Sequence, residues 1–275
     1  MNVKILESPI VLSKDIHLKR PRYLTLLLYL LEKISLMVSN FYLFALNRNW
    51  IKVPSLILES PYNYKCTIRE IWFSRILRRT LSLLVRSPLK KGTISLINNK
   101  LKLPSQTGCV IAIPHTPWSR LLAEWCKVNK FALVLVGGPW IKRTGSFNVP
   151  GGGFSGLKRT ISHLRSGGCV IVIGDNIGRW RCCKIHFLGK DCFASFLPAR
   201  IAESAGVPLL AIYPKFNDGM INIHNGFESR IEEIKADKQK VTQKVFDFFE
   251  TEIRDKPSIY EPYVLRSLHR LSSNV

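Results

Sequence analysis

Three short apolar runs limit the fold that this chain can adopt. They are Cys109–Ile113, Phe131–Val136 and Cys169–Ile173, and each consists mainly of Val, Ile or Leu without a charge. Uncharged runs of this length are typical of strands that are buried on both faces. Stretches with helical apolar spacing, at residues 118–126 and 157–164, separate the runs. The alternation predicts an α/β fold with a central, mostly parallel or mixed sheet flanked by helices.

Further elements are expected after the third run. Phe193–Ala205 has helical spacing and ends at a glycine, and Val207–Tyr213 forms a fourth apolar run. Ile221–His224 predicts one more short strand. Residues 142–156 contain Asn148, Pro150 and three consecutive glycines, a composition that predicts a loop.

The N-terminal part of the chain differs from this pattern. Residues 23–46 are strongly apolar and follow Lys19, Arg20 and Arg22. Charges at Glu32 and Lys33 are costly at bilayer depth, which favours a helix or helical hairpin in the membrane interface, or packed on the domain, over a spanning segment. We therefore expect a membrane-associated helical extension at 1–66 and an α/β domain at 67–275.

The chain carries 41 Lys and Arg against 19 Asp and Glu, a formal net charge of +22. This excess is spread along the sequence, so we expect an anionic partner: a membrane surface, an acidic carrier or a nucleic acid. A nucleic acid is the weakest of these, because the aromatic residues lie in apolar runs without interleaved Lys and Arg. The seven cysteines are odd in number and predict reduced thiols in a cytosolic compartment. No metal site is expected.

His115 stands where the first apolar run ends and a helix is about to begin. Thr116 is a plausible N-cap, and Pro117 suits the first helical turn. In open α/β sheets, functional groups gather at the carboxyl ends of strands beside helix N-termini. Asp175 ends the third run in the same way. Both residues are therefore candidate site residues, although a lone histidine is more often a satisfied structural residue.

Four blocks in a characteristic order carry a resemblance to a known family. They are the strand, His and helix around His115, then residues 156–178, residues 184–216, and the C-terminal stretch beginning FFETEIRDKPSIYEPY. In this order the chain resembles the lysophospholipid acyltransferase superfamily, within it the lipid A late acyltransferase (lauroyl or myristoyl acyltransferase) branch.

The resemblance implies transfer of a fatty acyl group from a thioester to a hydroxyl or amine of a lipid A-like or lysolipid acceptor. The donor would be acyl carrier protein or coenzyme A as co-substrate, with no bound cofactor, at the cytoplasmic face of the inner membrane. Attachment would be peripheral or through a single N-terminal anchor. His115 would act as the general base.

One position departs from the family pattern. The family places an Asp or Glu five residues after the histidine, where the sequence has Arg120. Glu124, one helical turn further, and Asp175, at the neighbouring strand end, are the alternative carboxylates. Arg120 itself could pair with Glu124 or donate to an oxyanion. The alternative to an active enzyme is a catalytically inactive relative that binds lipid or a partner.

Further substrate-binding candidates each have a structural alternative. Gly153 belongs to the triple glycine, which either approaches a phosphate or simply connects two elements. Trp118 lines an acyl groove or packs in the core. Arg179 and Arg200 bind phosphate or are solvated cations, and Gly189 permits a tight turn.

Overall fold

The computed structural model describes the chain in segments. The described residues are 22–47, 73, 76, 77, 79, 80, 83, 84, 96–98, 108–116, 118, 121, 122, 125, 126, 132–136, 148–150, 154–175, 182–217 and 220–255. The expected boundary between residues 66 and 67 lies outside them.

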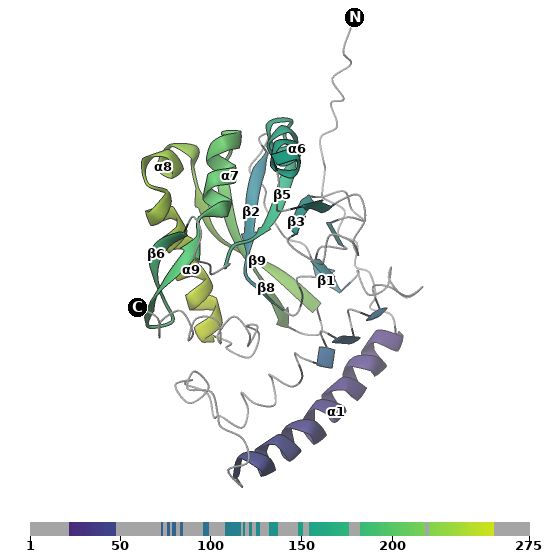
Figure 1. Ribbon diagram of the computed structural model, residues 1–275. Helices are drawn as coiled ribbons and strands as arrows, with labels where there is room; N and C mark the ends of the chain where they lie inside the picture. The colour runs from purple at the N-terminus through teal and green to yellow at the C-terminus, as the bar shows by residue number, and fades with distance from the viewer. Residues whose placement is uncertain are drawn as a thin grey trace, which may run out of the picture.

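A mixed sheet of seven strands forms the centre of the described structure (Figure 1). Its order is β1-β9-β8-β2-β5-β3-β4, and every neighbouring pair is parallel except β8 and β9, which are antiparallel. The strands are β1 (Ile97–Asn98), β2 (Cys109–Ile113), β3 (Leu133–Val136), β4 (Asn148–Pro150), β5 (Cys169–Ile173), β8 (Leu209–Asn217) and β9 (Met220–Ser229). The mixed α/β architecture predicted from the alternating runs is confirmed.

The two central strands, β2 and β5, have nearly the same sequence. Residues 108–115 read GCVIAIPH and residues 168–175 read GCVIVIGD. The strands pair in parallel with like opposite like, from Cys109 opposite Cys169 to Ile113 opposite Ile173. Every side chain of β2 is buried. Both runs therefore behave as the doubly buried strands that their composition predicts.

Helices α6 (Phe154–Arg165) and α7 (Leu197–Ala205) pack side by side against the sheet (Figure 1). Helix α7 ends at Gly206, which has a φ of 75° and whose N–H bonds to carbonyls of the last turn, as expected for a left-handed cap. The loop predicted for 142–156 is wrong in part. β4 lies within it because the edge of β3 offers a partner, and Pro150 is tolerated at an edge.

The helix predicted over Phe193–Ala205 is also wrong in its first part. The segment before α7 is instead the second strand of a hairpin, β6 (Cys182–Phe187) and β7 (Lys190–Ser195). Its turn, Leu188–Gly189, has φ values of 53° and 77°, the pair of positive angles that a two-residue hairpin of this type needs. Along β6 buried and exposed side chains alternate, and this period of two distinguishes the strand from a helix.

The C-terminal part of the described chain is helical, with α8 (Ile231–Ala236) followed by α9 (Lys238–Asp255). α9 packs against β6, β8 and β9. Its buried face repeats at helical spacing and consists of Val241, Thr242, Val245, Phe246, Phe249 and Ile253.

The apolar N-terminal segment forms one helix, α1 (Arg22–Asn47), which lies apart from the seven-stranded sheet in Figure 1. Its buried side is narrow and includes Leu31, Ser35 and Ser39. The hydroxyls of the two serines donate to backbone carbonyls three residues earlier. Its exposed side carries large apolar side chains: Leu26, Tyr29, Leu30, Ile34, Leu36, Met37 and Phe41. Within the described part of the chain, no helix combines the length and apolarity needed to cross a bilayer.

Candidate active site

The register of β2 and β5 brings His115 and Asp175 together. Ile113 lies opposite Ile173, so the residues two positions beyond each strand end are again neighbours. The N–H of Gly174 donates to the carbonyl of Ile113 at 2.7 Å and continues the pairing past the strands. Two residues 60 positions apart in sequence therefore meet at the carboxyl edge of the sheet.

Asp175 binds His115 through both carboxylate oxygens. Its Oδ2 accepts the backbone N–H of His115 at 2.8 Å, and its Oδ1 lies 2.7 Å from the ring Nδ1. A carboxylate accepts hydrogen bonds, so this contact assigns the ring proton to Nδ1 and leaves the lone pair on Nε2. The arrangement fixes both the orientation and the tautomer of the imidazole, as a general base requires.

The two partners differ in their access to solvent. The side chain of Asp175 is 0% exposed, whereas that of His115 is 23% exposed. The carboxylate is thus enclosed by protein, whereas the imidazole is partly exposed. A proton acceptor must be accessible to its substrate, and partial exposure of His115 is compatible with that role. A buried carboxylate keeps the same hydrogen-bond partner, because solvent does not compete for it.

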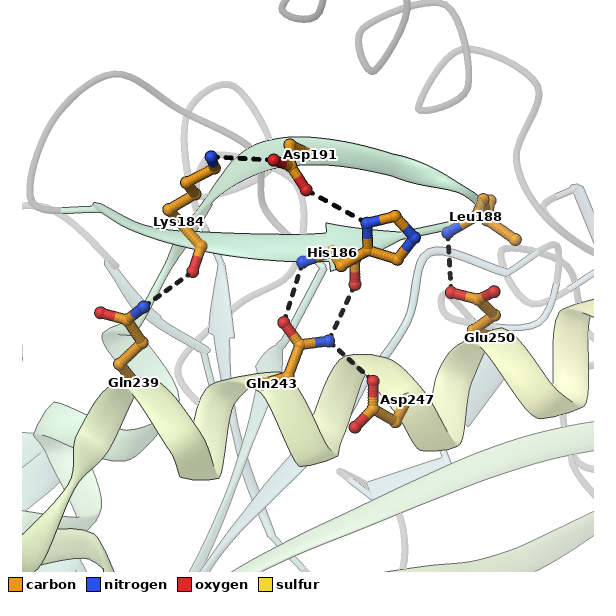
Figure 2. Close-up of polar contacts among 8 residues, drawn as sticks. All are labelled: Lys184, His186, Leu188, Asp191, Gln239, Gln243, Asp247 and Glu250. Carbon is orange, nitrogen blue, oxygen red and sulfur yellow. Dashed lines mark hydrogen bonds and ion pairs between the residues drawn. The ribbon is translucent and has the colours of Figure 1, made fainter.

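A second His–Asp pair lies on the hairpin and offers an internal comparison (Figure 2). His186 Nδ1 is 3.1 Å from Asp191 Oδ1, and both side chains are well exposed, at 61% and 57%. The other oxygen of Asp191 binds Lys184 at 2.8 Å. These hydrogen bonds, that from Lys184 first, lower the pKa of Asp191. A solvated pair with a competing cation lacks the enclosure that distinguishes the pair at the sheet edge.

The hairpin is held by α9 through side chains that pair with its backbone (Figure 2). The amide of Gln243 accepts the N–H of His186 and donates to the carbonyl of the same residue, each at 2.8 Å. Gln239 donates to the carbonyl of Lys184, and Glu250 accepts the N–H of Leu188. Gln239 and Gln243 are four residues apart on the helix, a rise of about 6 Å, and their partners Lys184 and His186 are two residues apart on the strand, a rise of about 6.6 Å. Because the two distances nearly match, successive helical turns can each bind the strand backbone.

The other predicted site residues divide into two groups. Trp118 is 1% exposed, in agreement with the core-packing alternative, and Gly189 is the second residue of the hairpin turn. Arg200 lies in the first turns of α7 with its guanidinium 5.6 Å from the ring of Phe196. Four candidates lie outside the described residues: Arg120, Glu124, Gly153 and Arg179.

Two of the cysteines, Cys109 and Cys169, form a buried pair at the start of β2 and β5, opposite the end that carries His115 and Asp175. Cys109 and Cys169 Sγ atoms are 3.5 Å apart, and their hydrogen bond raises the pKa of Cys109 and lowers that of Cys169. Burial raises the pKa of Cys192 to about 11. Among the described residues, no group of three His, Cys, Asp or Glu side chains could hold a metal ion.

Comparison with known proteins gives a family match over the C-terminal half. Residues 144–265 match the model of the bacterial lipid A biosynthesis acyltransferases. Over these residues the chain is similar to the lipid A biosynthesis acyltransferases. The match includes Asp175 and the hairpin, whereas His115 lies before it. No curated protein matches the chain.

One solved structure similar to this chain is the crystal structure of the 1-acyl-sn-glycerophosphate (LPA) acyltransferase PlsC from Thermotoga maritima. The sequences are 14% identical, and the alignment covers 84% of this chain and 96% of that chain with a TM-score of 0.37. A TM-score this low does not establish a shared fold.

Sequence reasoning missed two residues beside the pair, Gly174 and Phe249. A signal for each was present. Gly174 interrupts an otherwise β-branched run one residue before the acid, and such a glycine often marks a close approach of another element. Phe249 belongs to an apolar stripe at helical spacing in the last described helix.

Proposed function

We propose that this chain is a membrane-associated acyltransferase in which His115 is the general base and Asp175 orients it. The donor would be an acyl thioester of acyl carrier protein or coenzyme A, and the acceptor a hydroxyl or amine of a lipid A-like molecule or a lysolipid. The observation that carries the proposal is the pair of hydrogen bonds that the backbone N–H and the ring Nδ1 of His115 make to the buried Asp175 carboxylate, which accepts both.

The chemistry requires one proton acceptor and no covalent enzyme intermediate. Nε2 of His115 takes the proton as the acceptor oxygen or nitrogen attacks the thioester carbonyl. The tetrahedral intermediate then expels the thiolate by breaking the carbon–sulfur bond, and the imidazolium returns the proton to sulfur. Asp175 compensates the positive charge that His115 carries between these two steps.

Asp175 supplies the carboxylate that the family resemblance implies at the position of Arg120. An acid from the following helical turn and an acid from the neighbouring strand end can each bind the same Nδ1. The second arrangement fixes the imidazole through a strand register and not through a helix. This support for a competent base favours an active enzyme over a binding protein without catalytic activity.

The proposed attachment to the membrane rests on α1. A helix that exposes Leu30, Met37 and Phe41 while turning Ser35 and Ser39 inward has its polarity reversed relative to a surface helix in water. Lying in the interface plane would bury this apolar side, and the net charge of +22 would attract anionic headgroups. We propose the cytoplasmic face of the membrane as its location, as the family resemblance implies.

The catalytic proposal is tested by acyl transfer with purified protein, labelled acyl thioesters and a panel of lipid acceptors. His115→Ala should lower turnover by about 10²–10⁴-fold, the usual contribution of a positioned base. His186→Ala is the matched control because it removes a histidine from the exposed His–Asp pair, and it should retain the turnover of the unmodified chain. Equal activity of the two variants would refute the assignment, and an inactive wild-type chain would favour the binding protein.

The attachment is tested by flotation with vesicles that contain anionic phospholipid. Met37→Glu and Phe41→Glu place a charge on the exposed apolar side of α1 and should each weaken vesicle binding several-fold. Asn40→Glu adds the same charge to the same helix at an exposed polar position and should have a smaller effect. If all three variants float like the wild type, α1 is not the membrane-binding element.

A further inference from the structure

We infer that Phe249 of α9 is a positioning residue for the His115–Asp175 pair, acting through the backbone of Gly174. The inference rests on the proposed function for its kinetic consequence. Its geometric content, the support of one strand end by one aromatic ring, stands on the contacts alone.

Phe249 can approach the strand end because Gly174 has no side chain. A Cβ atom on Gly174 would lie 3.1 Å from Cβ of Ala112 and 3.2 Å from Cε2 of Phe249. Both distances are tighter than ordinary van der Waals contact, so the ring lies directly against the space that glycine leaves open. Glycine at this position therefore allows α9 to approach the peptide that precedes Asp175.

The hydrogen bond from Gly174 to Ile113 continues the strand pairing by one residue beyond β5. Because successive side chains of an extended segment point to opposite faces, we expect the Asp175 side chain to lie on the face away from Phe249. The ring then acts as a stop behind the strand end. On the other side, the two hydrogen bonds to His115 draw Asp175 toward β2.

Phe249 is itself kept in place by neighbouring rings. Its centroid lies 5.9 Å from that of Phe248 and 6.2 Å from that of Phe246, which in turn meets Phe187 edge to face at 5.0 Å. Phe249 and Phe246 are both 0% exposed. A buried ring packed against two other rings has little room to move away when the strand end moves, so its position is transmitted to Gly174.

The experiment compares Phe249→Leu with Phe187→Leu. Both changes remove one buried ring from the same aromatic cluster, but only the first removes the contact with Gly174. We expect Phe249→Leu to lower kcat about tenfold with little change in KM, and Phe187→Leu to leave kcat within about twofold at a similar loss of thermal stability. Phe249→Met, which retains bulk, should fall between them and remains informative if the leucine variant does not fold.

A second measurement does not depend on activity. In protein labelled with ¹⁵N-histidine, the Nδ1 and Nε2 shifts of His115 report the tautomer and its hydrogen bond to Asp175. Phe249→Leu should shift these signals toward those of Asp175→Asn, whereas Phe187→Leu should leave them unchanged. Unchanged His115 signals in Phe249→Leu, or equal effects of both variants, would overturn the inference. An inactive wild-type chain with the expected shifts would refute only the proposed function.

Discussion

Strands β2 and β5 have almost the same sequence and pair in parallel, yet different residues follow their carboxyl ends. They share Gly, Cys, Val and Ile at the start, and they differ at Ala112 opposite Val172, Pro114 against Gly174, and His115 against Asp175. The shared part builds a largely buried pair of strands with one register. The differing part places a histidine beside an aspartate, and a proline beside a glycine that allows α9 to approach.

In both segments the apolar residues form the buried strand, and the polar residue of the site follows the strand end. The apolar body fixes the register because a slip by one residue would reverse the direction of every side chain. Once the register is fixed, a single residue after each strand decides what the sheet edge presents. The following predictions test how far the two ends are specialised, beginning with the largest effect.

Replacing Asp175 with Asn should lower acyl transfer by about 10²–10⁴-fold. The amide retains the shape of the side chain but can turn its NH₂ group toward Nδ1 and stabilise the other tautomer of His115. Asp191→Asn in the exposed pair is the control and should change turnover little. Steady-state kinetics of the three proteins decide, and a fully active Asp175→Asn chain would show that the carboxylate is dispensable.

Exchanging the two ends, with His115→Asp and Asp175→His in one chain, should leave turnover at least about 100-fold below wild type. The backbone N–H of residue 115 now meets a carboxylate oxygen, and after the exchange it would face an imidazole. The double variant retains both functional groups, so the test isolates their placement. Recovery of wild-type turnover would mean that the two ends are equivalent.

Gly174→Ala should reduce the free energy of unfolding by about 1–3 kcal/mol, the usual cost of overpacking a core. The added methyl group meets Ala112 and Phe249 at 3.1 and 3.2 Å. Pro114→Ala, at the matching position of β2, removes atoms and should cause no such clash. Denaturant unfolding of both variants measures the difference, and equal costs would argue against the close approach of α9.

The smallest predicted effect concerns His163, at the other end of the strands. Burial lowers its pKa below 6.5, and a hydrogen bond to the Cys169 backbone partly offsets this. A histidine with a lowered folded-state pKa binds fewer protons when folded, so its contribution is complete above pH 6.5 and is lost as the pH falls below that value.

The wild type should therefore lose slightly more stability than His163→Gln between pH 7.5 and 5.5. Urea unfolding at the two pH values measures this difference. Parallel pH dependence of the two proteins would show that His163 does not titrate across this range.

The predictable part of the molecule was the part with strong patterning. Doubly buried strands such as β2 and β5 follow from uncharged runs of Val and Ile, and His115 and Asp175 follow from their position at the ends. The hairpin β6–β7 was missed because Phe193 to Ala205 carries apolar residues that also fit a helix. Pairing of β7 with β6 overrode that local preference.

The sequence by itself determined which segments are buried, that strands and helices alternate, and that a base and an acid each follow a strand. Only the tertiary structure decided that these two residues are partners. Strand order and register depend on contacts between segments that are distant in sequence. No local pattern predicts that His115 contacts Asp175, 60 residues away, or that Phe249 approaches Gly174. Hydrogen bonding between β2 and β5 converts two similar runs into one site, because it places equal positions of both runs side by side.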